Sequence, residues 1–262
     1  TVIVTDTTAP LITLQGLGNV VHEQAETYDD AGATAIDLVD GDLTDAITIS
    51  SDVDVQQAGS YTVTYTVSDA AGNPATPVIR AVTVADSIAP TMTLNGAALV
   101  NVEQGTSYTE LGASAGDAVD GNISDQIVIG GDMVNASAAG IYNVSYSVSD
   151  AAGNMASPTH RTVVVADTVA PAITLLGSQS IQQEQGQPYA EMGATAYDAV
   201  DGDISGAVVI DASGIDINTA GTYVVIYVST DSAGNQSMMS RQVEILDTMP
   251  PTIELNGSET IQ

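Results

Sequence analysis

The chain has 262 residues, with 33 acidic residues against three basic ones, and its formal net charge is −30. It therefore has almost no cationic side chains to displace the counterions of a nucleic acid, and an anionic membrane surface repels it. Hydrophobic residues nevertheless make up 44% of the chain, which excludes a disordered acidic tail. We expect a folded acidic protein whose natural small partners are cations.

The sequence contains no cysteine, which excludes disulfides and thiolate metal sites. No apolar run approaches the roughly 18 residues that a membrane helix needs, so we expect no membrane insertion. The chain opens and closes in the middle of a repeated pattern. We therefore expect an excerpt of a longer protein, in which the absence of a signal peptide carries little weight.

A short motif, Asp followed by Thr or Ser and ending in Pro, divides the chain. It begins at Asp6, Asp86, Asp167 and Asp247, at separations of 80, 81 and 80 residues. This period exceeds the roughly 20–50 residues of solenoid repeats and suits a small domain with its own core. The predicted boundaries are 1–5 (closing strand of a preceding repeat), 6–85, 86–166 and 167–246 (three complete repeats), and 247–262 (first strand of a further repeat).

Each repeat is predicted to consist of β-strands. In the first repeat, strands are expected at residues 10–14, 32–37, 45–50, 59–69 and 78–86, separated by turns rich in Gly, Asn and Asp. The longest alternates with period 2 and places Tyr61, Val63, Tyr65 and Val67 on one face. No helical periodicity extends over ten residues. About seven short strands per repeat predict an all-β chain of tandem immunoglobulin-like sandwiches, arranged end to end.

The stretches DTTAPLITL, YDDAGATAIDLVDGDLT and AGSYTVTYTVSDAAGN carry a family resemblance. The repeat resembles the bacterial immunoglobulin-like tandem repeats of large surface and adhesin proteins, a type also found in an insecticidal crystal protein. It is similar as well to the PKD, HYR and cadherin-like sandwiches. The resemblance covers essentially the whole chain and recurs three times. It implies a secreted or cell-surface bacterial location and a module that usually acts as a spacer.

Acidic residues concentrate in two loops of each repeat. The strand order of an immunoglobulin-like sandwich places both loops at one end of the domain, beside the linker from the preceding repeat. We call residues 37–42, 117–122 and 198–203 the B–C loops, and residues 69–73, 150–154 and 231–235 the F–G turns. The candidate ligands of the first rim are Asp6, Asp37, Asp40, Asp42 and Asp69. Those of the first junction are Glu23, Asp86, Asp117, Asp120, Asn122 and Asp150. Those of the second junction are Glu103, Asp167, Asp198, Asp201, Asp203 and Asp231.

Two interpretations of these residues compete. Clustered oxygen ligands without His or Cys suit Ca²⁺ better than Mg²⁺, which retains its waters and demands octahedral geometry. The layout also resembles the calcium-bridged junctions of cadherins, although the cadherin linker motif is missing. Alternatively, Asp-Gly only forms hairpin turns, and Asp and Asn only cap them. Mutual repulsion among unneutralised carboxylates favours the cation site.

Two further sets of residues recur with the repeat. Nine of the ten tyrosines occupy three equivalent positions and are expected to pack in the core, one of them as a tyrosine corner. The three arginines, Arg80, Arg161 and Arg241, share one position and are expected to pair with a nearby acid on the closing strand.

The sequence leaves functions from different classes to compare. Catalysis is disfavoured because no nucleophile–base pair or phosphate-binding loop is present. A non-catalytic extender stiffened by Ca²⁺ is favoured over a module that binds a glycan, a host protein or a second copy. The repeats are equivalent, and their most divergent segments (50–57, 130–138 and 211–219) offer no large anchor residues. The expected partners are calcium ions and neighbouring repeats, with no nucleic acid.

Overall fold

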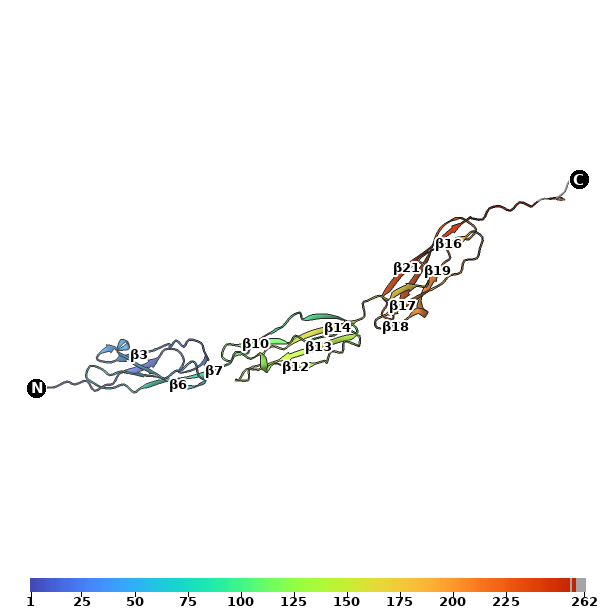
Figure 1. Ribbon diagram of the computed structural model, residues 1–262. Coiled ribbons are helices and arrows are strands. Elements are labelled where there is room, and N and C mark those ends of the chain that lie inside the picture. The colour runs from blue at the N-terminus through green and yellow to red at the C-terminus, as the bar shows by residue number, and fades with distance from the viewer. Residues whose placement is uncertain (255, 258–262) are drawn as a thin grey trace. The chain divides into compact units, whose positions relative to one another are not determined.

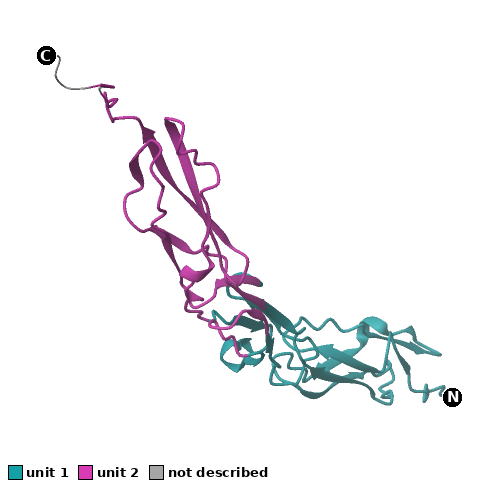
Figure 2. Cartoon of the chain, turned by 90° about the vertical axis from the view of Figure 1, so that its right-hand side faces the viewer, with its two compact units in different colours: residues 1–98, 110–132, 144–161 teal, residues 99–109, 133–143, 162–262 magenta. Residues whose placement is uncertain are grey.

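The computed structural model describes residues 1–254 and 256–257, and Figure 1 shows its strands in chain order. Three repeats each contribute one three-stranded and one four-stranded sheet, so the predicted all-β tandem sandwiches are confirmed. The chain divides into two compact units (Figure 2), which comprise residues 1–98, 110–132 and 144–161, and residues 99–109, 133–143 and 162–262.

The first repeat has the sheet orders β1-β3-β4 and β2-β7-β6-β5. Its strands are β1 (Leu11–Leu14), β2 (Asn19–Glu23), β3 (Ala33–Asp37), β4 (Gly41–Asp42), β5 (Thr48–Ser51), β6 (Gly59–Thr66) and β7 (Val78–Ala85). A short 3₁₀ turn, η1 (Thr44–Ala46), precedes β5.

The second and third repeats keep the same order of elements. The second contains β8 (Thr91–Leu94), β9 (Leu99–Glu103), β10 (Ala113–Asp117), β11 (Gly121–Asn122), η2 (Ser124–Gln126), β12 (Val128–Gly131), β13 (Gly140–Ser147) and β14 (Thr159–Ala166). The third contains β15 (Ala172–Leu175), β16 (Ser180–Glu184), β17 (Ala194–Asp198), β18 (Gly202–Asp203), η3 (Ser205–Ala207), β19 (Val209–Asp211), β20 (Gly221–Thr230) and β21 (Gln236–Leu246).

Two strands of each repeat were not predicted individually: the parallel strand β2 and the two-residue strand β4, with their equivalents. In the third repeat, β15 pairs antiparallel with β17, and β16 then pairs parallel with β21 in the other sheet. The chain changes sheets in a tight turn at Gly177, whose φ of +82° favours glycine. This parallel strand ends at Glu184, and its equivalents β2 and β9 end at Glu23 and Glu103.

The core follows the predicted period-2 pattern. Val63, Tyr65 and Val67 are buried on one face of the first repeat. In the third, Tyr227 and its neighbours on β20 pack with residues of β15, β17 and β21. The expected tyrosine corner is also present, because the Tyr223 hydroxyl donates to the Thr219 carbonyl at 2.9 Å.

The arginine position lies at the centre of a buried polar network. Arg241 is fully buried and pairs with Glu191 at 2.5 Å, and Tyr227 donates to the same carboxylate at 2.5 Å. Glu191 precedes β17, so the prediction of a partner on the closing strand is wrong. Arg241 faces inward, whereas Glu244 on the same strand faces Gln182 at the surface. The equivalent pairs are Arg80 with Asp30 and Arg161 with Glu110.

The described residues on either side of the three repeats, 1–10 and 247–254, lie outside these sheets. Residues 1–10 form no strand, including the segment 1–5 that was expected to close a preceding repeat. The prediction that 247–262 begins a further repeat falls partly on residues 255 and 258–262, which lie outside the described residues.

Candidate functional site

The B–C loop of the third repeat is a turn capped by Asp198. Its Oδ1 accepts the backbone N–H groups of Val200 at 2.7 Å and Asp201 at 3.0 Å. Gly202 closes the turn at a φ of +76°, which explains the Asp-Gly pair. The other oxygen of Asp198, Oδ2, is buried and accepts no hydrogen bond from the described residues. The turn therefore explains the role of Oδ1 but not the burial of Oδ2.

The F–G turn fixes a second carboxylate and reaches the linker. Asp231 accepts the backbone N–H of Asn235 at 2.7 Å and its side-chain amide at 2.9 Å. The same amide donates to the backbone carbonyl of Asp167 at 3.1 Å. Asn235 thus joins the F–G turn to the linker, and Asn154 and Asn73 make the equivalent contacts with Asp86 and Asp6.

These loops bring three carboxylates together in every repeat, and we call each set an acidic triad. One oxygen from each member lies within 4.8 Å of the others. The triads are Asp6, Asp40 and Asp69; Asp86, Asp117 and Asp150; and Asp167, Asp198 and Asp231. The first triad includes Asp40 instead of Asp37. Asp37 nevertheless also keeps a buried Oδ2, to which none of the described residues donates a hydrogen bond.

The linker aspartates are electrostatically unfavourable in these positions. Burial raises the pKa of Asp167, and the charges of Asp198 and Asp231 raise it further. Burial and the charges of Asp117 and Asp150 raise the pKa of Asp86 in the same way. The chain has no lysine, and its three arginines are buried and paired with other acids, so no Lys or Arg side chain offsets this repulsion among the described residues.

The chemistry of the triads fits a hard divalent cation. Buried carboxylate oxygens that accept no hydrogen bond from the described part of the chain occur at Asp6, Asp37, Asp117, Asp167 and Asp198. A buried, uncompensated anionic oxygen is costly unless a donor or a cation meets it. Oxygen ligands drawn from separate loops suit Ca²⁺, which accepts irregular coordination by six to eight oxygens.

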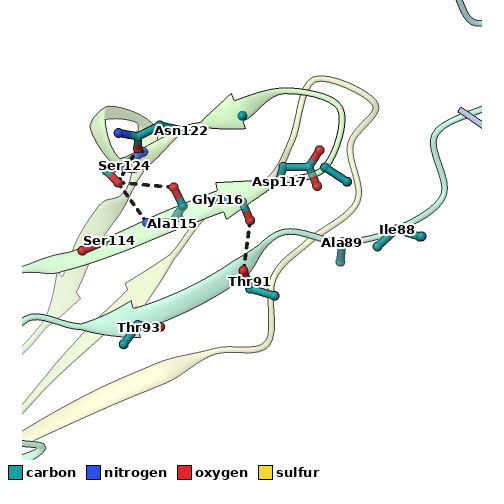
Figure 3. Close-up of a pocket in the computed structure, with 12 residues that line it drawn as sticks. Ile88, Ala89, Thr91, Thr93, Ser114, Ala115, Gly116, Asp117, Asn122 and Ser124 are labelled. Atoms are coloured by element: carbon teal, nitrogen blue, oxygen red, sulfur yellow. Dashed lines mark hydrogen bonds between the residues drawn. The ribbon is translucent and has the colours of Figure 1, made fainter. Parts of the chain in front are cut away.

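Other predicted ligands lie outside the triads and have structural partners. Asp201 accepts the Ser232 N–H at 2.7 Å and fastens the B–C loop to the F–G turn, as Asp120 does with Ala151. Asp203 accepts the Ser205 N–H at 3.0 Å at the start of η3. Asn122 and Asp42 do the same for Ser124 and Thr44. Figure 3 shows Asn122 bonded to Ser124, while Asp117 lies at the end of β10 near linker residues Ile88 and Ala89.

The predicted glutamates contact the linker backbone. Glu103 accepts the N–H of Thr168 at 3.0 Å and its hydroxyl at 2.5 Å. Glu23 makes the same pair of bonds with Ser87. These bonds lower the pKa of both glutamates, the side-chain hydroxyl having the largest effect. We call each such contact a glutamate latch.

Sequence reasoning missed two sets of residues at this site. Glu184 forms a third latch with Thr248, and the F–G asparagines join the linker to the triad. Both sets have a sequence signal, because each residue recurs at the repeat period. An asparagine in a turn is so common, however, that its reach to the linker was not apparent.

Comparison with protein families identifies all three repeats. The model of the bacterial surface protein Ig-like domain matches residues 12–84, 92–165 and 173–245. The chain belongs to this family. The predicted family resemblance is therefore confirmed, and membership supports a structural or adhesive extracellular module of a surface or secreted protein. Domains of this family are typically non-catalytic.

Curated relatives are much longer than this chain. Pesticidal crystal protein Cry22Aa of Bacillus thuringiensis is 28% identical over 89% of the chain and 32% of its own length. Hyalin of Strongylocentrotus purpuratus is 29% identical over 78% of the chain and 18% of its own length. The chain thus spans about a third or less of these relatives.

Solved structures similar to the chain include extracellular cadherin-type proteins. The human desmocollin-1 ectodomain aligns with 94% of the chain and 63% of its own length, at 12% identity and a TM-score of 0.36. Mouse cadherin-23 EC22–24 aligns with 92% of the chain and 99% of its own length, at 11% identity and a TM-score of 0.28.

The described residues contain no helix long and apolar enough to cross a membrane.

Proposed function

We propose that the chain is a non-catalytic spacer of a secreted or cell-surface bacterial protein, stiffened by Ca²⁺ where each linker joins the following repeat. The proposed repeats are residues 6–85, 86–166 and 167–246, each beginning with its linker aspartate. The acidic triads are the proposed sites. Asp37, Asp120 and Asp201, with Asp42, Asn122 and Asp203, shape the B–C loops around them.

One observation carries this proposal. A linker carboxylate meets two carboxylates of the following repeat, and the Oδ2 atoms of Asp167 and Asp198 are buried with no hydrogen-bond partner among the described residues. A turn alone needs no linker carboxylate, and it leaves no reason to bury a second unpaired oxygen. A Ca²⁺ ion would neutralise the triad and fix the linker to the repeat.

Calorimetric titration tests the proposal. Ca²⁺ is titrated into the chelator-stripped chain, with Mg²⁺ in a parallel experiment. We expect about three ions per chain, one for each triad. Dissociation constants of about 10⁻³ M or tighter are expected, with weaker Mg²⁺ binding and a higher melting temperature in Ca²⁺. The absence of both calcium heat and a melting shift would refute the site.

A matched pair of variants assigns the binding to the triads. Asp198→Asn keeps the turn-capping oxygen but removes a charge from the third triad, so one equivalent of Ca²⁺ should be lost. Asp211→Asn is the control, because Asp211 is exposed and caps a turn through Ser213 in the same repeat. Equal loss in both variants would indicate non-specific binding to an acidic surface.

A further inference from the structure

Each glutamate latch holds the residue that directly follows a linker aspartate. Both carboxylate oxygens of Glu103 are engaged, one by the Thr168 N–H and one by the Thr168 hydroxyl. Bonds from neutral donors to a carboxylate are among the stronger hydrogen bonds in proteins. Glu103 is not a member of the acidic triads, and both of its carboxylate oxygens already hold the linker.

The same linker residue is held from the other side by the following repeat. Asn235 donates to the Asp167 carbonyl at 3.1 Å and, through the same amide nitrogen, to the Asp231 carboxylate at 2.9 Å. The backbone of Asp167 and Thr168 is therefore fixed by two side chains without any ion. The Oδ2 of Asp167 is left buried beside Asp198 and Asp231, and no group in residues 1–254 or 256–257 donates a hydrogen bond to it.

We propose that Glu23 and Glu103 are positioning residues that preset the linker aspartate for cation binding, rather than ligands of the cation. This inference rests on the proposed calcium function, because part of its test measures calcium affinity. If the linker already holds its binding conformation, the ion spends no binding free energy on placing it. The apparent calcium affinity is then not reduced by a low population of that conformation. Glu184 holds Thr248 beside Asp247 by the same two bonds and has no part in the three described triads.

The test compares three substitutions in the full chain. Calcium binding is followed by amide NMR shifts of Gly72, Gly153 and Gly234, which lie in the three F–G turns and report on each triad separately. Glu103→Ala should weaken the third site about tenfold, because the linker is then correctly placed only a fraction of the time. Glu103→Gln retains an oxygen acceptor and should restore most of the affinity. Glu184→Ala, the matched control, should leave all three described sites unchanged.

Two results would overturn the proposal. Unchanged calcium affinity in Glu103→Ala would show that the latch does not position the linker. Equal weakening by Glu103→Gln and Glu103→Ala would show that the glutamate charge itself binds the ion.

Amide hydrogen exchange separates this inference from the calcium proposal. In chelator, the Thr168 amide of the parent chain should be protected, and Glu103→Ala should remove that protection. If the parent binds no Ca²⁺ but shows this pattern, the calcium function fails and the ion-independent latch stands. An unprotected Thr168 amide in the parent would refute the latch whatever the calcium result.

Discussion

Two acidic regions of the same repeat differ in what surrounds them. Glu191 precedes β17 and meets Arg241, Tyr189 and Tyr227. Asp198 ends that strand, and among the described residues it meets other carboxylates and two backbone amides. The chain therefore supplies the counter-charge for one region and leaves the other without one.

The pKa values respond in opposite directions. Burial alone raises the pKa of Glu191, but hydrogen bonds from the two tyrosines and Gly193, with the Arg241 charge, lower it overall. Burial also raises the pKa of Asp167, and its neighbours Asp198 and Asp231 add to the rise. Desolvation acts alike in both regions, and the partner decides the sign. For the triad, the partner that we propose is a cation from solution.

The largest expected effect comes from removing the internal counter-charge. Arg241→Met leaves the partly buried Glu191 without its cation and empties a fully buried position, and we expect the third repeat to lose about 3 kcal/mol of unfolding free energy. Urea denaturation measures the loss.

A double variant checks that the loss arises from the pair. Arg241→Met with Glu191→Gln should be less destabilising than the sum of the two single substitutions, because the stranded charge is gone. Strict additivity would show that the two side chains contribute independently.

Removing a charge from the triad should change the stability of the repeat in the opposite direction when no ion is bound. In chelator, Asp198→Asn removes one of three neighbouring charges and should stabilise the third repeat by about 1 kcal/mol. In saturating Ca²⁺, the same variant should be less stable than the parent, because it loses the ion. Urea denaturation with and without chelator checks this reversal. If Asp198→Asn destabilised the repeat under both conditions, Asp198 would act only through its turn.

The pH dependence of stability should show both regions in one curve. The raised pKa values of Asp86 and Asp167 mean that their stabilising contribution is full below the unfolded pKa and is lost as pH rises. Hydrogen bonds from Tyr65, Gly32 and Tyr28 outweigh burial and lower the pKa of Asp30 to about 2. Its contribution is present above the unfolded value of 3.8 and is lost as pH falls toward 2.

Thermal melts in chelator measure this curve. The melting temperature should rise slightly as pH falls from 7 toward about 4.5, and then drop steeply below about 4. A melting temperature that declines continuously from neutral pH would mean that the triads are not repulsive.

The smallest expected effect concerns the tyrosine corner. Tyr223→Phe removes only the hydroxyl bonded to Thr219, and we expect a loss of about 1 kcal/mol in the third repeat. Tyr197→Phe is the control, because Tyr197 is 63% exposed and should change stability very little. Equal effects of the two substitutions would show that the corner bond contributes nothing specific.

The fold was largely accessible from sequence because its signals are local and repeated three times. Alternation along β6 and β20 predicts strands and their buried face directly. The parallel strand β16 was missed because it has only five residues, SIQQE, and lies at the edge of a sheet. So short a segment shows little of the alternation between apolar and polar residues that predicts a strand.

The site was only partly accessible. The grouping of Asp167, Asp198 and Asp231 follows from strand order, and the structure brings the three together. The latch of Glu103 and the bridge of Asn235 depend on which atom each side chain meets, and spacing alone does not determine that. The partner of Arg241 was misplaced because a neighbour along the strand faces the opposite side of the sheet.

The burial of the arginines bears on how long such a chain survives outside a cell. Enzymes that cleave after basic residues can act only at Arg80, Arg161 or Arg241, because the chain has no lysine. Each of these side chains is at most 1% exposed, inside a strand. The linkers and loop tips, which are the usual points of attack, contain no basic residue. The folded repeats therefore present no cleavage site to trypsin-like digestion.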